Sequence, residues 1–323
     1  MPNGADVIGF FEKNGLRHGE FPLPKSCTVF NVSWNCDATI LSVHFSAENP
    51  SEHSIQLWVV SNYKWQLKKS WTSSDKFYGF QWDPVMPLTL YIFAPTNGFK
   101  YELKWKIHQS RGVSSDDLSY ASIIDGSILK VTPFREMVVP PPISAFELHV
   151  SGNISDVMFS NSIQDFNSLA VITENSQVYV FDTTGNADES IVKITGAGGN
   201  GFIPKCTTLK LLKTFKLQES NGKELYNWCW FTPNAAMACQ GQLIYIFDME
   251  NGALKETLIC EEDVVDIIAM ESSNVAVVLS DGNMLKISDL FELTPYEGVE
   301  PLPRRCSNIQ IVENQVIGKP NNF

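Results

Sequence analysis

The sequence of 323 residues is 44% hydrophobic and 19% charged, so it is long enough for one large domain or two smaller ones and apolar enough to fill a core. Its formal net charge of −12 argues against a general nucleic-acid-binding protein, because a phosphate backbone would be repelled on average. It contains no run of roughly 18 apolar residues that could cross a bilayer, and it starts without the pattern of a signal peptide. We therefore expect a folded, cytoplasmic protein without a membrane association.

Paired strands with a short turn between them are the main signal along the chain: an apolar run, a turn containing Gly or Asn, and a second run with alternating or β-branched residues. In chain order, such hairpins are expected at residues 88–94 and 99–105, 120–124 and 128–134, 169–172 and 178–181, 235–239 and 243–247, and 275–279 and 284–287. A further strand tends to precede each unit, at residues 29–34, 77–82, 155–159, 225–231 and 264–268. No long window shows the 3.6-residue period of a helix, so an α/β fold with crossover helices is not expected.

Each hairpin and the strand ahead of it make three strands, and a fourth strand often follows them. Four-stranded units that repeat around an axis are the blades of a β-propeller. Residues 178–182 and 244–248 both end in Phe-Asp, at the strand end where a typical WD-repeat blade has Trp-Asp. Phe181 and Phe247 are 66 residues apart, more than the usual period of about 40–45, because a glycine-rich insertion at residues 183–205 lies between them. We predict an all-β fold of WD-repeat-like β-propeller blades.

Three consecutive prolines, Pro140, Pro141 and Pro142, mark the best candidate for a domain boundary, because they cannot donate ladder hydrogen bonds and favour a stiff, extended connection. We expect residues 1–138 to form the C-terminal blades of a first propeller and residues 139–323 the blades of a second, incomplete one. Residues 7–12 resemble a late strand of a blade and residues 308–317 an unfinished hairpin. The sequence therefore predicts a piece of a longer protein.

Two short motifs match patterns known from cofactor-binding or catalytic sites. In both cases the surrounding sequence does not fit such a site. Residues 196–201 fit G-x-G-x-x-G, but a dinucleotide site needs a helix that opens at the last glycine, and Pro204 follows instead. We predict a flexible loop between blade strands there. Ser61 and Lys64 fit the S-x-x-K motif of penicillin-binding enzymes, yet without its companion motifs the pattern favours a polar turn between strands.

Cysteines, histidines and charged runs give no stronger site. The seven cysteines are irregularly spaced without a C-x-x-C pair, and the five histidines show no H-x-x-x-H spacing, so neither a disulfide framework nor a metal site is predicted. The acidic runs at residues 116–117 and 261–263 favour solvated turns over paired catalytic carboxylates. A basic and aromatic stretch that could stack on RNA consists of Lys64, Trp65, Lys68, Lys69 and Trp71, but strand alternation favours solvated lysines beside packed tryptophans. We assign no catalytic, cofactor-binding or metal-binding residue.

Four stretches carry a family resemblance: FFEKNGLRHGEF at residues 10–21, QLWVVSNYKW at 56–65, WDP at 82–84 and VVPPP at 138–142. Together they resemble the Elongator complex protein 1 family, also called the IκB kinase complex-associated protein, through most of the chain. The resemblance implies part of the largest Elongator subunit, a scaffold in which two N-terminal propellers precede helical repeats and a dimerisation region.

The resemblance also implies a function. In that family the complex modifies the wobble uridine of certain transfer RNAs, starting the 5-carboxymethyl-type modifications that lead to 5-methoxycarbonylmethyl-2-thiouridine. The chemistry belongs to a separate radical S-adenosylmethionine and acetyltransferase-like subunit. The implied role is a non-catalytic scaffold without a cofactor that binds the other Elongator subunits, contacts transfer RNA mainly indirectly and dimerises in the full-length protein through a region outside this chain. The implied location is the cytoplasm, with the nucleus as a second one.

Three alternatives stay open. One is a generic protein-interaction WD-repeat propeller in trafficking or signalling. Another is a propeller hydrolase, which needs His, Asp and Glu side chains that converge near the axis. The third is an RNA-binding surface at the lysines of residues 64–69, which needs those lysines to be accessible.

Overall fold

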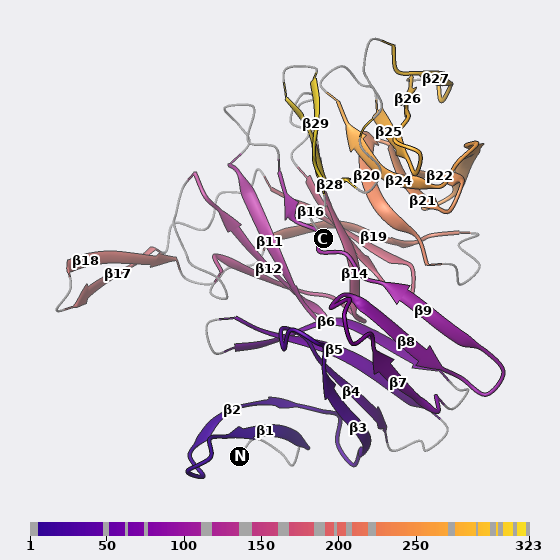
Figure 1. The fold of residues 1–323 in the computed structure, drawn as a ribbon. Helices are drawn as coiled ribbons and strands as arrows, with labels where there is room; N and C mark the ends of the chain where they lie inside the picture. The colour runs from indigo at the N-terminus through magenta and orange to yellow at the C-terminus, as the bar shows by residue number, and fades with distance from the viewer. Residues whose placement is uncertain are drawn as a thin grey trace. The chain divides into compact units, whose positions relative to one another are not determined.

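The computed structural model consists of β-strands and their connections wherever it describes the chain (Figure 1). It describes residues 6–47, 52–61, 64–73, 77–110, 118–135, 144–160, 168–183, 191–196, 199–204, 209–218, 224–270, 275–288, 290–297, 302, 306–312 and 315–320, with the backbone alone at 191–204 and 306–320. Within these residues, no helix is long and apolar enough to cross a membrane. The chain divides into two compact units, which are described in turn.

The first unit comprises Met1–Ile107, Ser122–Val131 and Val139–His149. It starts with a hairpin of β1 (Val7–Phe11) and β2 (Arg17–Pro22). A four-stranded antiparallel sheet follows in the order β3-β4-β5-β6, with bounds Thr28–Trp34, Leu41–Ser46, His53–Ser61 and Lys64–Ser73. A three-stranded sheet contains β7 (Gly79–Trp82), β8 (Thr89–Phe93) and β9 (Gly98–Glu102).

The second unit comprises His108–Ala121, Thr132–Val138 and Val150–Phe323. One of its sheets has the order β14-β15-β16-β19, with bounds Ile154–Phe159, Ser168–Thr173, Gln177–Asp182 and Lys210–Lys216. The next is β20-β21-β22-β23, at Tyr226–Thr232, Ala235–Gln240, Leu243–Asp248 and Leu254–Ile259. A third is β24-β25-β26-β27, at Val264–Ala269, Val275–Leu279, Met284–Ile287 and Leu293–Pro295, and the hairpin of β28 (Cys306–Val312) and β29 (Gln315–Pro320) follows.

One further sheet lies where the predicted domain boundary falls. It has the order β10-β11-β12-β13, with bounds His108–Gln109, Tyr120–Asp125, Ile128–Pro133 and Phe146–His149. Strand β12 precedes the proline run and β13 follows it, and the two pair in antiparallel register from Ile128 with His149 to Val131 with Phe146. The prolines themselves lie outside the described residues, and the division at 138/139 stays a prediction.

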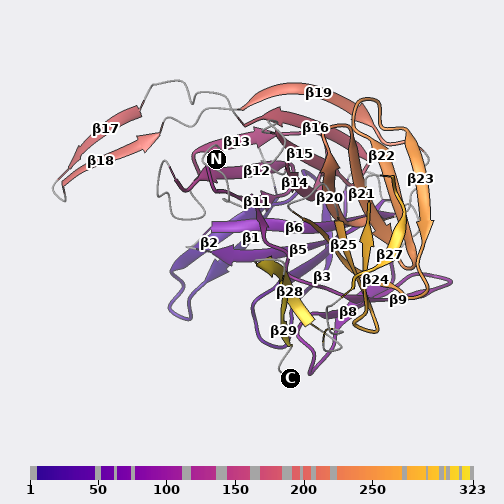
Figure 2. The same ribbon diagram turned by 90° about the horizontal axis from the view of Figure 1, so that it is seen from above.

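The first strands of successive sheets contact one another, which is the arrangement of propeller blades around an axis. In the second unit the contacts run from β10 to β14, β14 to β20, β20 to β24 and β24 to β28, and in the first unit β3 contacts β7. Seen from above, the sheet of β14 and the sheet of β20 lie next to each other with β19 and β23 as their outer strands (Figure 2). The predicted all-β propeller class is therefore confirmed.

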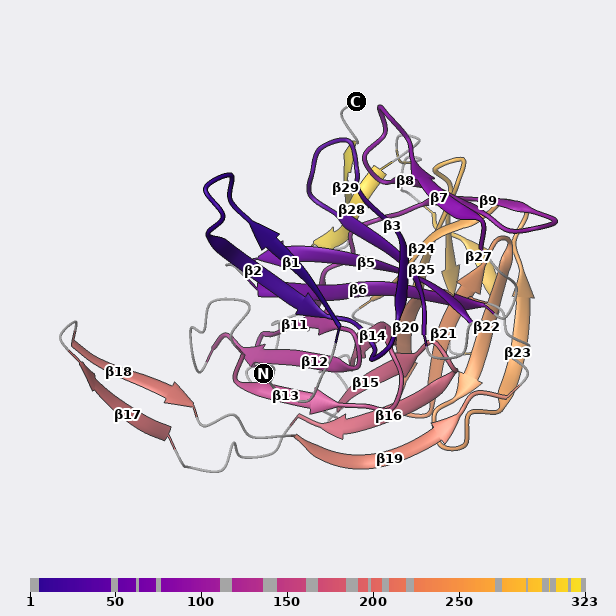
Figure 3. The same ribbon diagram turned by 90° about the horizontal axis from the view of Figure 1, so that it is seen from below.

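All five predicted hairpins are present, as β8–β9, β11–β12, β15–β16, β21–β22 and β25–β26, and the strands expected ahead of them are β3, β7, β14, β20 and β24. The sequence does not predict the meander of β4, β5 and β6, and it predicts a flexible loop at residues 196–201, within the glycine-rich insertion at 183–205. Part of that insertion is instead an antiparallel hairpin of β17 (Ile191–Gly196) and β18 (Gly199–Pro204), visible as a separate pair of strands in Figure 3.

Strand alternation explains why both faces of a blade are buried. Along β21, Met237 packs in the cluster shared with the sheet of β24, while its neighbour Ala236 packs in the cluster shared with the sheet of β14. In β22, Ile244 and Ile246 lie in the former cluster, and Phe247 lies in the latter. Since successive side chains of a strand point to opposite faces, each sheet is held by two cores, and each fully buried aliphatic residue contributes about 1.5–3 kcal/mol of hydrophobic stabilisation.

Candidate functional site

Two neighbouring first strands of the second unit, β10 and β14, place one histidine and one aspartate side by side. Nδ1 of His108 in β10 lies 3.4 Å from Oδ1 of Asp156 in β14, and the two side chains are only 10% and 7% exposed. The same ring nitrogen lies 3.2 Å from the carbonyl oxygen of Val157. A bulge between Ile154 and Asp156 turns the carboxylate, which also accepts a hydrogen bond from the Val157 amide at 2.7 Å.

The neighbouring first strand repeats this arrangement with an amide. Nδ2 of Asn227 in β20 donates to the carbonyl oxygen of Val265 in β24 at 2.7 Å. Asn227 has a φ of 56°, a left-handed conformation that asparagine tolerates better than most residues. It sits in a bulge between Tyr226 and Cys229, so its side chain is turned toward the next sheet.

Asp266 of β24 closely matches Asp156 of β14. Each lies in a bulge of a first strand, and each accepts a hydrogen bond from the amide of the residue that follows it. Polar side chains on the first strands therefore bind backbone groups of the same or the next strand. Such bonds satisfy backbone groups that would otherwise be buried without a partner, and they fix the spacing of neighbouring blades.

The contacts of His108 with a carboxylate and a backbone carbonyl fit a structural role between two strands. Triad chemistry would need a nucleophile within hydrogen-bond reach of the histidine. Among the described residues, no group of three or more His, Cys, Asp or Glu side chains is placed to hold a metal ion. Because His108 and Asp156 are 48 positions apart, no local pattern in the sequence could have paired them.

The glycine motif lies in a hairpin and not at the start of a helix. Gly196 ends β17, Gly199 starts β18, and the two residues are paired partners. A dinucleotide site needs the amide groups of a helix N-terminus at this point. Gly196 and Gly199 therefore lie in paired strands, and no helix starts at β18.

The S-x-x-K motif closes a strand pair. Ser61 and Lys64 are register partners at the ends of β5 and β6, as expected for a turn between strands. The acidic run at residues 261–263 is exposed between β23 and β24, also as expected. Residues 116–117 lie outside the described part of the chain.

The lysines of the basic and aromatic stretch are not all solvated, which corrects the sequence analysis. Nζ of Lys68 donates to the Gln66 side chain at 2.6 Å and to the carbonyl oxygen of Ile124 in β11 at 2.7 Å. Burial lowers the pKa of Lys68 from 10.5 to about 8. Lys69 is half-buried, and its Nζ lies 5.8 Å from the ring centroid of Trp71, within cation–π range. Because Lys68 holds two parts of the first unit together, it is not available to an RNA phosphate.

A buried histidine pair in the first unit was not predicted. Nε2 of His44 in β4 and Nδ1 of His53 in β5 are 3.0 Å apart, and both residues are buried. The ring of Phe30 stacks on His53 with centroids 5.0 Å apart. Burial, with a smaller contribution from the charge of His53, lowers the pKa of His44 to about 4. The two residues lie diagonally across the β4–β5 pair, in which His44 is opposite Ile55 and Ser46 is opposite His53. The sequence pattern predicts no hairpin there, so it could not indicate the contact.

Two hollows open on the described surface. One, of about 380 Å³, lies between β3 and β7 and includes Trp34, Trp82 and Asp83 in its lining. The amides of Met86 and Val85 donate to Asp83 and hold the pKa of its carboxyl below the usual value. The other, of about 270 Å³, lies on the sheet of β24–β27 and has acidic side chains at its rim.

Two family models match the chain. The model described as the ELP1 first N-terminal beta-propeller matches residues 2–85, and the model described as the ELP1 N-terminal second beta-propeller matches residues 123–318. The solved structures add no argument: the crystal structure of Saccharomyces cerevisiae Sqt1 aligns over 89% of this chain and 79% of its own with 8% identity and a TM-score of 0.34.

Relatives carry the same name in distant organisms. Elongator complex protein 1 of Mus musculus is 31% identical over 360 residues, which cover 96% of this chain and 27% of the relative. Elongator complex protein 1 of Saccharomyces cerevisiae is 35% identical over 166 residues, which cover 50% of this chain and 12% of the relative. The chain thus spans about a quarter of the length of the mouse protein. Since the second-propeller model alone covers more than half of the chain, the chain belongs to the Elongator complex protein 1 family.

Proposed function

We propose that this chain is a propeller region of a scaffold subunit of the Elongator complex and that it supports wobble-uridine modification of transfer RNA without taking part in the chemistry. Its membership of the family, across two different propeller models, carries the proposal. The first-strand contacts support it, because two polar side chains of these strands, His108 and Asn227, contact backbone carbonyls of the neighbouring first strand. Such groups stabilise blades and leave the rims to bind partners.

The partners proposed are the other Elongator subunits, including the catalytic radical S-adenosylmethionine and acetyltransferase-like subunit. Transfer RNA would be contacted mainly through those subunits, since the net charge of −12 opposes direct binding. Dimerisation would use a region of the full-length protein beyond this chain. The proposed location is the cytoplasm, with the nucleus as a second one.

Co-purification from cells tests the scaffold role. The full-length protein that contains this chain is tagged at its own locus, and the bound proteins are identified by mass spectrometry. The other Elongator subunits are expected in the bound fraction, and depletion of the protein is expected to lower 5-methoxycarbonylmethyl-2-thiouridine in bulk transfer RNA. A bound fraction that contains trafficking or signalling proteins and no Elongator subunit would favour a generic interaction propeller instead.

A point variant tests the non-catalytic role separately. His108→Gln removes the imidazole and keeps a side chain that can donate to the Val157 carbonyl. We expect the variant complex to assemble and the modified uridine to stay within about twofold of the wild type, a change of roughly 0.4 kcal/mol or less. An intact complex that has lost modification would make His108 a catalytic residue and would contradict the proposal.

A further inference from the structure

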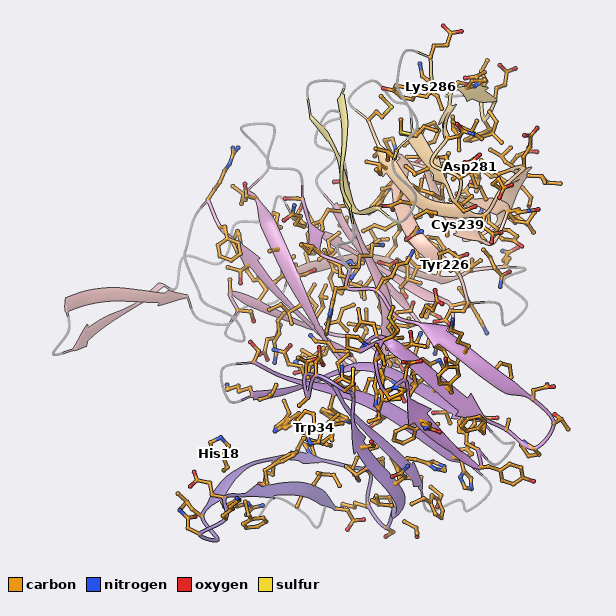
Figure 4. The ribbon with its side chains drawn as sticks, viewed as in Figure 1. His18, Trp34, Tyr226, Cys239, Asp281 and Lys286 are labelled. Atoms are coloured by element: carbon orange, nitrogen blue, oxygen red, sulfur yellow. The ribbon has the colours of Figure 1, made fainter. Side chains whose placement is uncertain are left out.

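The hollow on the sheet of β24–β27 combines an apolar floor with an acidic rim. Its apolar lining consists of Leu279, Met284, Leu285, Pro295 and Tyr296, of which Leu279 and Met284 are buried. The rim carries Glu261 and Glu262 from the β23–β24 connection, together with Asp281 and Asn283 from the β25–β26 turn. The labelled Asp281 marks this turn in Figure 4. All of these residues belong to the second unit.

Hydrogen bonds hold the two acidic segments in place. The Ser280 hydroxyl donates to Oε2 of Glu262 at 3.1 Å, and the Ser280 amide donates to the Asp263 carbonyl at 2.8 Å. The Asn283 amide donates to Oδ1 of Asp281 at 2.9 Å. On the other side, the Tyr296 amide donates to the Met284 carbonyl at 3.0 Å and closes the wall formed by the outer strand. These hydrogen bonds fix the segments around the hollow, so binding would require little reordering.

The charge around the hollow is strongly one-sided. Between Glu256 and Glu300 the sequence has eleven acidic residues and one basic residue, Lys286. Within the described residues, no ion pair joins Glu261, Glu262 or Asp281 to a cation. This segment supplies most of the net charge of −12 of the whole chain. Its field attracts a cationic partner and repels nucleic acid.

The size of the hollow distinguishes between kinds of occupant. Small-molecule sites usually enclose about 300–1,000 Å³ with few charges in their lining, whereas this hollow measures about 270 Å³ and has three carboxylates at its edge. It suits one apolar side chain that anchors an extended segment, with cationic neighbours that reach the rim. In such a contact the apolar anchor supplies affinity and the charges supply orientation and association rate.

We propose that this hollow is a docking site for a short segment of a partner protein in which an apolar residue is flanked by lysines or arginines. The inference deepens the scaffold function proposed above and rests on it, because a scaffold needs surfaces that select its partners. The occupant is a separate protein and not a part of this chain. The chain has its own basic pair close in sequence to the hollow, Arg304 and Arg305, which lie outside the described residues. The test must therefore distinguish binding of a partner from binding of this pair.

A synthetic peptide with a central leucine and two lysines on each side is the probe, labelled for fluorescence anisotropy and titrated with the whole chain. We expect saturable binding that weakens as salt is raised. Replacing the leucine of the peptide with serine should weaken binding at least about fivefold, since burial of a leucine side chain is worth about 1.5–3 kcal/mol. Equal affinity of the two peptides would overturn the proposal, because the contact would then be general charge attraction.

Paired protein variants locate the site. Glu261→Lys with Glu262→Lys should weaken peptide binding at least about tenfold, equivalent to 1.4 kcal/mol. The control Glu250→Lys changes an exposed residue in the β22–β23 turn outside the hollow and should change affinity less than about twofold. Unchanged thermal unfolding of each variant shows that the fold is intact. Equal losses in both variants would contradict a localised site.

A further variant decides between a partner and the chain itself. Arg304→Ala with Arg305→Ala should leave peptide affinity unchanged. If the peptide binds only after this change, the chain's own segment occupies the hollow and the proposal is wrong. Absence of binding in every variant also overturns it, while co-purification of Elongator subunits with the full-length protein would still report on the scaffold function independently.

Discussion

The strand β3 of the first unit and the strand β20 of the second unit hold the same position, first in a four-stranded sheet, yet they differ in burial. In β3, six of the seven residues are exposed, among them Phe30 at 52% and Trp34 at 38%. In β20, Trp228 and Trp230 are 6% and 3% exposed. Strand β20 contacts the first strands of two other sheets, β14 and β24. Within the described residues, β3 contacts the first strand of one other sheet, β7. Burial of a blade strand thus depends on neighbours on both sides more than on its own apolar content.

The largest expected effect comes from the strand with two neighbours. Trp230→Ala should lower the free energy of unfolding of the second unit by about 3–5 kcal/mol, because it opens a cavity in the cluster that contains Met158 and Phe247. Chemical denaturation followed by circular dichroism measures the loss. A loss below about 1 kcal/mol would show that this core is not the one that stabilises the unit.

The two units also differ in how closely their turn glycines are packed. Gly252 has a φ of +75°, and an added Cβ would lie 2.5 Å from the carbonyl oxygen of Lys216. Gly15, in the β1–β2 turn, has a φ of +86° with nothing within 4 Å of an added Cβ. Gly252→Ala should therefore cost about 2–4 kcal/mol, the sum of left-handed strain and steric overlap, and Gly15→Ala about 1–2 kcal/mol from strain alone. Equal losses would mean that space around the turn has no influence, and thermal unfolding distinguishes the two outcomes.

Strand β4, which pairs with β3, is buried even though β3 is mostly exposed. The burial of His44 in β4 should make the stability of the fold depend on pH. The pKa of His44 is lowered from 6.5 to about 4 in the folded chain. As the pH falls through this window, the unfolded chain takes up the proton before the folded one does, so the stability of the fold decreases. The expected loss between pH 6.5 and 4 is roughly 2–3 kcal/mol, at about 1.4 kcal/mol for each pKa unit.

Two histidine variants check this prediction. In His44→Gln the stability loss between pH 6.5 and 4 should be smaller by the amount given above, when it is measured by urea denaturation across that range. The control His149→Gln, whose side chain is 66% exposed, should leave the pH profile unchanged. A profile that responds to both variants equally would argue against a role for burial.

The smallest expected effect returns to β3. Trp34→Ala should cost about 1 kcal/mol or less in free energy of unfolding, since the residue is 38% exposed and its ring centroid lies 6.5 Å from that of Phe10 and 5.8 Å from that of Trp65. Denaturation under the conditions used for Trp230→Ala provides the matched measurement. A loss as large as that of Trp230→Ala would break the comparison between the two strands.

Local patterns determined much of this fold. Turn pairs such as Asn97 with Gly98 and Gln240 with Gly241, each between apolar runs, predicted the hairpins β8–β9 and β21–β22. These signals are short-range, because strand alternation and turn chemistry act over a few residues. The meander of β4, β5 and β6 was missed for a related reason: in β4 all six residues are buried, including Ser42 and His44, so alternation gave no clear signal.

The residues of the candidate sites are brought together only by the tertiary structure. The sequence fully determined the net charge of −12, the acidic run at residues 261–263 and the strands that flank it. Only the pairing of β24 with β25 brought Glu262 to Ser280, and only the pairing of β26 with β27 brought Tyr296 to the hollow. Only the contact of two sheets brought His108 to Asp156. The physical reason is that a strand defines its own two faces, whereas the sheet packed against each face is supplied by segments far away in the sequence.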